Sequence, residues 1–482
     1  MATIFNYHLI VVLTADLLAT AGDVTYSWTS PIYPKLYSND SSINPLGTPI
    51  TPDEDSWLGS LATVGALLCF LPYGYISGKF GRKIALLAVA IPHIISFTIF
   101  AFATHIYLFY AARFLGGIAL GGGYFLLPMY ISEISRDANR GAMSLTLNVF
   151  WAIGNFLPYA IGPFMSIYWF NITLALIPTT FFVLFIILAP ESPYYLVEVG
   201  RIKEAEKSLM LLRSCDEEGI KEELRSILAY TNIAEDSNFW ETIKDKSLRK
   251  AFCVSLVLIM TQDLSGFTVI TNHLQSIFES AGTNMAPEIA ALIVGLLLFV
   301  SSFIAPFLVD RAGRRPLTIW SCLGMCAALT MLGAFFYFQS REFGTRFINW
   351  MPIFSLIFYI VSFNMGICAM PWVLTSELFP NKAKRVAVSI ATVSCSIMSF
   401  ITTKTFNDLG EWVGKSGTFW LFAGWCLCSA LFSIAFVPET KGMSFSDIQQ
   451  MLNADKGDQR EINEVELMLM KNGKAEKTVD EV

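Results

Sequence analysis

Amide side chains lie inside several of the long apolar runs of this sequence, where a polar group needs a partner. Gln262 lies about a dozen residues into the run 251–278, near the middle of a membrane helix at ~1.5 Å of rise per residue. Asn148 and Asn155 are seven positions apart in another run and therefore share one helical face. An amide both donates and accepts hydrogen bonds, which suits a ligand rich in hydroxyl groups. The alternative role of such an amide is a structural hydrogen bond between two helices.

Charged residues inside apolar runs form a second group of candidates. Asp23 lies in the first run and Arg113 in the fourth. A carboxylate at the centre of a bilayer costs at least ~2.5 kcal/mol on insertion scales, so it needs a partner or a task. Asp23 is the first candidate for such a task, with Asp16 and Asp263 as alternatives. A location near the outer interface, or a permanent ion pair, would also explain Asp23.

The elements that must position these residues are membrane helices. The chain has 482 residues, of which 54% are hydrophobic and 15% charged, and its mean hydropathy is +0.53. Soluble proteins carry ~25% charged residues, and a bilayer span needs ~20 apolar residues. The long apolar runs are 7–29, 56–77, 84–104, 107–131, 141–163, 167–189, 251–278, 288–309, 316–338, 350–376, 386–406 and 417–437. These twelve runs predict an all-α membrane protein with twelve transmembrane helices.

The chain is organised as two similar halves around a polar middle. Blocks of glycine and basic residues at 78–83 and 310–315 each follow the second apolar run of their half. Between the halves, the stretch Arg201–Leu212 has apolar residues on one side and charges on the other, as in an amphipathic helix. Two pseudo-symmetric six-helix bundles are therefore expected. The expected domains are an N-terminal bundle (1–196), a cytoplasmic helical linker (197–250), a C-terminal bundle (251–445) and a cytoplasmic tail (446–482).

The distribution of charge predicts the orientation in the membrane. Basic residues concentrate in alternate loops, at 79–83, 136–140, 201–250, 311–315 and 382–385 and after 441. By the positive-inside rule these loops and both termini are cytoplasmic. The glycosylation sequons at Asn39 and Asn171 fall on the opposite side. We therefore expect a multi-pass plasma membrane protein.

The nine cysteines lie almost wholly within apolar runs. None is in an external loop, so no disulfide framework is expected. We expect these cysteines to be small buried packing residues rather than metal ligands. The close pairs Cys322/Cys326 and Cys426/Cys428 have no histidine or carboxylate beside them. The sequence therefore predicts no metal site.

Several motifs, in this order, resemble the sugar porter family of the major facilitator superfamily. The block 310–315 matches the family's Gly-x-x-x-Asp-Arg-x-Gly-Arg-Arg loop, whereas Gly78 replaces the aspartate in the first copy. The further matches are Arg113-x-x-x-Gly117-x-x-x-Gly121, Pro190-Glu191-Ser192-Pro193 and Pro438-Glu439-Thr440-Lys441-Gly442. The resemblance covers about residues 7–445. Within the family, Thr29-Ser30-Pro31 and the stretch 55–60 are similar to insect facilitated trehalose transporters.

The resemblance implies a sugar site near mid-membrane. Gln262 matches the first glutamine of the family's Gln-Gln-x-x-Gly motif. Asn148 aligns with a substrate-contacting glutamine, and Trp372 with the tryptophan under the sugar ring. An inter-helix hydrogen bond remains the alternative role of Gln262.

The sequence departs from the family pattern at positions that would contact a hexose. Asp263 replaces the second glutamine, and Thr268 stands where asparagine is usual. Leu298 and Cys395 occupy other usual asparagine positions. Several amide contacts to a hexose would be missing, which leaves a different sugar, a disaccharide or another polyol open as the substrate. The expected substrate-binding residues are Gln262, Asn148, Trp372, Asp263, Thr268, Asn155 and Asn364.

The resemblance also implies a candidate for proton coupling. In proton-coupled sugar porters an aspartate of the first span faces the arginine that Arg113 matches. Proton binding to that carboxylate would release the arginine and bias the conformation. Here the family's Gly-Tyr-Asp is Gly22-Asp23-Val24, so the carboxylate is one position early. Coupling through Asp23 and Arg113 and the absence of coupling both stay open.

Charged residues at the cytoplasmic ends of the spans are expected to form a gate. Exposed ion pairs are each worth ~0–1 kcal/mol, so several can break as the gate opens. Gly78 in place of an aspartate predicts a weaker latch in the first half. The alternative is that these residues form no gate and only provide solvated charge at the membrane surface. The expected gate residues are Arg82, Lys83, Glu133, Arg140, Glu191, Asp310, Arg311, Arg314, Arg315, Glu377, Lys384, Arg385 and Glu439.

The leading hypothesis is a transmembrane carrier of a hexose or a disaccharide such as trehalose, which works by alternating access and is facilitative or proton-coupled. The alternative is a transporter-like sugar sensor with little transport. No nucleophile–base set, metal cluster or phosphate-binding loop indicates an enzyme, and no basic, aromatic-rich patch indicates nucleic-acid binding. We expect no cofactor. The expected partners are a sugar, the lipid bilayer and, in the coupled case, protons, and we expect a monomer.

Overall fold

The computed structural model describes residues 7–136, 139–233, 246–341, 348–379, 381–441 and 443. Within these ranges the regular structure is helical, and no strand is present. The helices are α1 (Tyr7–Ser27), α2 (Thr29–Leu36), α3 (Pro52–Leu68), α4 (Phe70–Phe80), α5 (Arg82–Phe102), α6 (Ile106–Ile134), α7 (Arg140–Ile161), η1 (Gly162–Phe164), α8 (Ile167–Leu188), α9 (Pro193–Glu198), α10 (Ile202–Arg213), α11 (Glu217–Ile233), α13 (Lys246–Leu264), α14 (Phe267–Asn272), α15 (Leu274–Ala281), α16 (Pro287–Ala312), α17 (Arg314–Ser340), α18 (Met351–Met365), α19 (Met370–Leu378), α20 (Asn381–Trp412) and α21 (Gly414–Phe436). The expected tail 446–482 lies outside the described residues.

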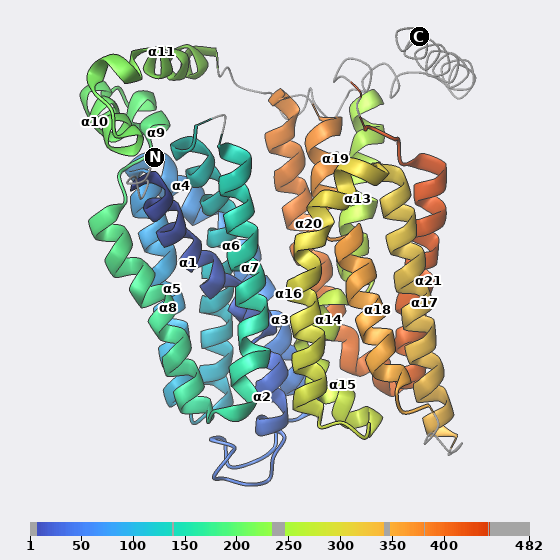
Figure 1. Ribbon diagram of the computed structural model, residues 1–482. Coiled ribbons are helices and arrows are strands. Elements are labelled where there is room, and N and C mark those ends of the chain that lie inside the picture. Colours follow the sequence, from blue (N-terminus) through green and yellow to red (C-terminus); the bar gives the residue numbers. More distant parts are fainter. Residues whose placement is uncertain are drawn as a thin grey trace, which may run out of the picture.

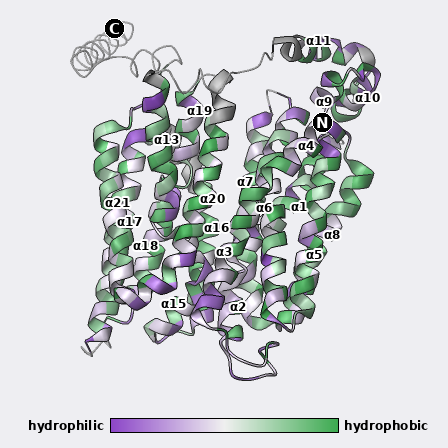
Figure 2. Ribbon diagram, turned by 180° about the vertical axis from the view of Figure 1, so that it is seen from behind, coloured by the Kyte–Doolittle hydropathy of each residue, from purple (hydrophilic) through white to green (hydrophobic). Residues whose placement is uncertain are grey.

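Two helical bundles lie side by side, one built from α1–α8 and the other from α13–α21 (Figure 1). Ten helical segments of the described chain are long and apolar enough to cross a membrane. The 22-residue α7 and the 26-residue α16 take the two remaining span positions. Figure 2 shows hydrophobic residues along most of the length of these helices. The prediction of twelve membrane helices in two bundles is therefore confirmed.

The short helices α9–α11 lie across one end of the first bundle, close to the start of α1 (Figure 1). We call this the insert end, and the opposite end, where α2 and α15 lie, the distal end. The amphipathic stretch expected at Arg201–Leu212 coincides with α10, whose Leu209 packs on Ile220 and Ile227 of α11. Buried Arg213 joins α10 to the bundle, because its Nη1 donates to the carbonyl of Ile134, 2.7 Å away.

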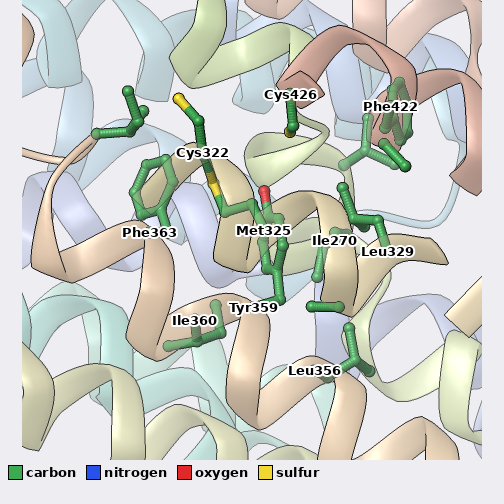
Figure 3. Packing of buried hydrophobic residues seen from close by; sticks show 14 of the residues in the cluster. Ile270, Cys322, Met325, Leu329, Leu356, Tyr359, Ile360, Phe363, Phe422 and Cys426 are labelled. Atoms are coloured by element: carbon green, nitrogen blue, oxygen red, sulfur yellow. The ribbon is translucent and has the colours of Figure 1, made fainter. Parts of the chain in front are cut away.

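The second bundle has one continuous apolar core. Side chains from α14, α17, α18 and α21 interdigitate there (Figure 3). The labelled members are Ile270, Cys322, Met325, Leu329, Leu356, Tyr359, Ile360, Phe363, Phe422 and Cys426. This core fixes the three long helices α17, α18 and α21 against one another and supports the short α14.

The run 56–77 is interrupted between α3 and α4, and two apolar runs of the second half that were expected to be single helices are interrupted as well. The run 251–278 breaks at Gly266, whose φ of +85° is left-handed and costs a glycine little. A Cβ at this position would also lie 2.6 Å from the ring of Phe422. The run 350–376 breaks between α18 and α19, where a Cβ on Gly366 would lie 2.5 Å from the carbonyl oxygen of Leu317. The two breaks bring irregular backbone to the middle of the second bundle.

The candidate sequon residue Asn171 is not accessible in this structure. Its side chain is completely buried in α8. The amide oxygen accepts a hydrogen bond from Trp28 Nε1 (2.8 Å), and the amide nitrogen donates to the carbonyl of Ile167 (2.8 Å). Both halves of the amide are therefore used inside the bundle. Asn39, by contrast, is exposed in the loop between α2 and α3.

Candidate functional site

Gln262 lies in the last turn of α13, at the first helix break. Its Nε2 donates to the carbonyl oxygens of Ile367 and Cys368, each 2.9 Å away. These carbonyls belong to the second break, between α18 and α19, so the side chain joins the two irregular segments. The described hydrogen bonds use only the two amide hydrogens, which leaves the amide oxygen as an acceptor for a ligand.

Asp263 and Thr268 form a buried network beside Gln262. One carboxylate oxygen accepts from the Thr268 hydroxyl (2.8 Å), and the other accepts from the Cys395 thiol of α20 (3.2 Å). Ser399 of α20 donates to the Thr268 hydroxyl at 3.3 Å. The two predicted substrate residues are thus brought together, and their described bonds fasten the α13–α14 break to α20.

A second network surrounds Asp23 in the first bundle. The carboxylate accepts hydrogen bonds from the hydroxyl of Tyr124 in α6 and from Asn155 Nδ2 in α7 (2.6 Å). The Tyr124 ring stacks on Trp151 with centroids 5.0 Å apart, and Tyr26 meets it edge-on at 6.4 Å. Asp23 therefore positions one aromatic face and one amide from two other helices.

The remaining predicted substrate residues differ in their surroundings. Asn148 is exposed on α7, and Trp372 is half-buried on α19. Asn364 is buried, and its amide nitrogen donates to Ser301 Oγ (2.6 Å) and to the carbonyl of Leu298 (3.2 Å). Asn364 thus joins α18 to α16, which is a hydrogen bond between helices.

Arg113 is buried in α6 but does not bond to Asp23 in the described structure. Its guanidinium donates to three backbone carbonyls, those of Leu58 (2.8 Å), Thr25 (2.5 Å) and Gly59 (3.3 Å). Its charge also lies over the Trp28 ring, 5.7 Å from the centroid. In this conformation the two candidate residues for proton coupling therefore bond to different partners.

At the insert end the two halves repeat one arrangement of charges. Arg82 bonds to Glu133 (3.1 Å) in the first half, as Arg314 bonds to Glu377 (2.9 Å) in the second. Each glutamate lies at the cytoplasmic end predicted for its helix.

A carboxylate also caps the first helix after each basic block. Glu191 accepts from the backbone N–H of Arg82 (2.8 Å), and Glu439 accepts from that of Arg314 (3.0 Å). Burial raises the pKa of the Glu191 carboxyl, although the backbone N–H groups oppose this rise. A Cβ on Gly81 or Gly313, whose φ angles are +100° and +89°, would overlap these carboxylates.

The described ion pairs among the predicted gate residues lie within one half. The side chains of Lys83 and Arg315 bond to the carbonyls of Ile186 (3.0 Å) and Ile434 (2.5 Å), also in their own halves. Arg140 begins α7. The side chains of Asp310, Arg311, Lys384 and Arg385 lie outside the described part of the chain.

At the distal end, described hydrogen bonds join the two halves. The bonding pairs are Asp53–Lys404 (2.6 Å), Asp55–His273 (3.1 Å), Pro52–Asn407 (2.9 Å), Thr29–Asn272 (3.2 Å), Ser30–Gln275 (3.2 Å) and Tyr159–Thr271 (2.8 Å). Figure 1 shows the two bundles closest together at this end. The distal end is therefore closed by bonds between the halves.

Sequence reasoning did not find Tyr124, Trp151 or His273, and it named Cys395 only as a position where the family usually has asparagine. Tyr124 follows the glycine run 121–123, and Trp151 lies in the apolar run 141–163, so neither residue belongs to a polar motif. The signal that was available is the pair Asp23 and Asp263, because a buried carboxylate requires donors from neighbouring helices.

Comparison with known proteins supports the assignment of the fold. The xylose transporter XylE from E. coli, in a partially occluded inward open conformation, superposes with a TM-score of 0.74 over 91% of this chain and 99% of that chain, at 23% identity. This chain therefore has the same fold as that protein.

The sequence matches the family described as "Sugar (and other) transporter" over residues 35–452. The facilitated trehalose transporter Tret1 of Bombyx mori is 33% identical over 409 residues, which are 84% of this chain and 80% of that protein. Tret1 of Apis mellifera ligustica is 31% identical over 452 residues, 92% of this chain and 88% of the relative. The chain spans about half (51%) of the longer Tret1 of Drosophila pseudoobscura pseudoobscura. The chain belongs to the sugar transporter family.

Proposed function

We propose that this transporter carries a disaccharide such as trehalose, or a hexose, by alternating access between two half-bundles. One observation supports this proposal above the others: Gln262 joins the two helix breaks of the second half and keeps its amide oxygen for a ligand. Asp23 holds Tyr124 and Asn155 in the first half. An aromatic face and amide groups are what a sugar ring and its hydroxyls require.

The described conformation corresponds to one end state of the proposed alternating access, in which the distal end is closed. The distal end is held by hydrogen bonds between halves, whereas the described ion pairs of the insert end lie within single halves. Opening the distal end would break the bonds between halves without breaking the Arg82–Glu133 and Arg314–Glu377 pairs. We infer that these pairs hold each half rigid while the halves rock.

Counterflow in proteoliposomes tests the proposal. Vesicles loaded with unlabelled trehalose are expected to accumulate labelled trehalose transiently, because a carrier exchanges the two through the same site. A panel with glucose and xylose, measured with and without a pH gradient, distinguishes the substrate and separates facilitative from proton-coupled transport. Absence of counterflow for every sugar would favour the alternative function, a transporter-like sugar sensor with little transport.

Replacing Gln262 by alanine is expected to lower counterflow at least tenfold and to remove the increase in melting temperature that trehalose gives the wild type. The variant loses the ligand acceptor, and a ligand stabilises only the form it binds. Because two bonds to Ile367 and Cys368 are also lost, the melting temperature without sugar serves as the control for folding. Unchanged counterflow in a variant of normal melting temperature would remove Gln262 from the site.

We propose a location in the plasma membrane with the insert end and both termini in the cytoplasm, and a monomer as the working unit. The basic residues of α10 and of the two blocks support this orientation. Tags at the two termini of the expressed protein are expected to bind antibody only after the cells are permeabilised. Labelling of intact cells would contradict this orientation.

A further inference from the structure

His273 and Asp55 form a buried contact between the two halves at the distal end. His273 lies between α14 and α15 of the second half, and Asp55 lies in the first turn of α3. Nε2 of the ring is 3.1 Å from Oδ1 of the carboxylate. The exposed fractions are only 5% for His273 and 2% for Asp55, so water does not readily satisfy either group.

Both ring nitrogens of His273 face oxygen atoms that can accept a hydrogen bond. Nδ1 of His273 lies 3.1 Å from the carbonyl oxygen of Val269, which can only accept, so this contact is a hydrogen bond only when Nδ1 carries a hydrogen. Nε2 faces a carboxylate oxygen of Asp55, which also accepts. A neutral imidazole has a single N–H. The bond to Val269 and the bond between halves, made together, therefore need one more proton, on the ring or on the carboxylate.

The aromatic groups around the pair exclude water and add one donor. The Tyr33 ring stacks on His273 with centroids 4.8 Å apart, and Phe406 of α20 lies 5.0 Å from the ring on another side. Tyr37 donates its hydroxyl to the second oxygen of Asp55 at 2.8 Å. Since Tyr37 satisfies Oδ2, the proton between Oδ1 and Nε2 decides whether the contact between halves is favourable.

The other charged groups near the pair already have partners. Lys404 of α20 bonds to Asp53 at 2.6 Å, and Glu54 of α3 accepts from the backbone N–H of Thr51 at 2.8 Å. Arg113 of α6, which interacts electrostatically with Tyr33, is bonded to backbone carbonyls. None of these described groups lies within bonding distance of Nε2, so the added proton belongs to the His273–Asp55 pair.

We propose that the distal end closes with the uptake of one proton by the His273–Asp55 pair and opens with its release. In the open state water can bond to each group separately, so the ring and the carboxylate no longer need to share an added proton. The closed state thus binds one proton more. Its population rises as the pH falls and declines as the pH rises. This inference rests on the proposed alternating access.

A distance measurement across the distal end tests the inference on the full chain in lipid nanodiscs. Labels on non-natural residues at the exposed positions Ser42 and Asn284 report whether the halves are together. Between pH 5.5 and 8.5 the ratio of closed to open forms is expected to fall, by at most tenfold per pH unit for one proton. An identical distribution at both pH values would overturn the inference.

Two aspartate-to-asparagine substitutions distinguish the effect of the His273–Asp55 pair from that of a neighbouring bond between the halves. Asp55→Asn can donate an amide hydrogen to neutral Nε2, so it is expected to stay closed at pH 8.5 and to lose the pH dependence. Asp53→Asn, at the neighbouring bond to Lys404, is expected to keep the wild-type pH dependence. Wild-type pH dependence in Asp55→Asn, or its loss only in Asp53→Asn, would overturn the inference.

The distance measurement needs no sugar, so it separates this inference from the proposed function. A pH-dependent distance without counterflow of any sugar would support the proton-linked closure and contradict the transport proposal. Counterflow with a distance that does not change with pH would support the transport proposal and contradict the proton-linked closure. His273→Gln, which keeps one side-chain donor, is expected to flatten the pH profile of the distance as Asp55→Asn does.

Discussion

Replacing Gly117 by alanine is expected to remove most of the folded transporter. A Cβ at this position of α6 would lie 2.7 Å from the carbonyl carbon of Ala62 in α3, and one on Gly65 of α3 would lie 2.7 Å from the amide nitrogen of Ile118. These are backbone atoms of the facing helix, so no side chain can rotate away. The helices must separate, and overpacking of this kind costs about 1–3 kcal/mol or more.

The damage should extend beyond one methyl group, because Arg113 lies one turn from Gly117 on α6. Its bonds to the carbonyls of Leu58 and Gly59 in α3 would lengthen as the helices part. We expect the yield of monodisperse protein in gel filtration to fall about tenfold and the remaining protein to melt at a lower temperature.

Gly74→Ala is the matched control for this experiment. Gly74 is also a helical glycine of the first half, but a Cβ there has nothing within 4 Å. Its yield and melting temperature should equal those of the wild type. A Gly117→Ala protein with wild-type yield and melting temperature would contradict the described contact between α3 and α6.

The sequence was sufficient to predict the helices, their number and the repetition of the two halves. Length and apolar composition decide whether a segment crosses a bilayer, and the repeated blocks at 78–83 and 310–315 mark equivalent positions. The breaks at Gly266 and Gly366 were missed. Their cause is tertiary: the ring of Phe422 and the carbonyl of Leu317 exclude a side chain, and no apolar pattern along the chain records that.

The sequence predicts which polar residues lie in the membrane helices, but it predicts their hydrogen-bond partners less well. Helical periodicity places Asn148 and Asn155 on one face of α7, but the bond from Asn155 to Asp23 depends on how α7 packs on α1. The three-residue sequon at Asn171 carries no information on burial, and Trp28 uses that amide instead. Long-range contacts of this kind come from the packing of whole helices.

Replacing Asp23 by leucine is expected to lower trehalose counterflow at least tenfold while most of the protein still folds. Leucine suits an apolar span but accepts no hydrogen bond, so the hydroxyl of Tyr124 and the amide of Asn155 lose their partner. An unsatisfied buried donor costs about 1–3 kcal/mol. The Tyr124 ring, stacked on Trp151, would then be free to turn, and displaced binding groups lower the rate of a step that needs them in place.

Asp23→Asn separates the hydrogen bonds of this residue from its charge. The asparagine oxygen can accept from Tyr124, and its amide nitrogen can donate to Asn155 once the Asn155 amide has rotated by half a turn. Counterflow in this variant should therefore stay within threefold of the wild type, and the pH dependence of the distal distance should persist, because His273 and Asp55 are unchanged. If Asp23→Asn instead lost counterflow as fully as Asp23→Leu, the charge itself would be needed. Loss of only the response to a pH gradient would identify Asp23 as the coupling carboxylate, even though Arg113 is bonded elsewhere in this conformation.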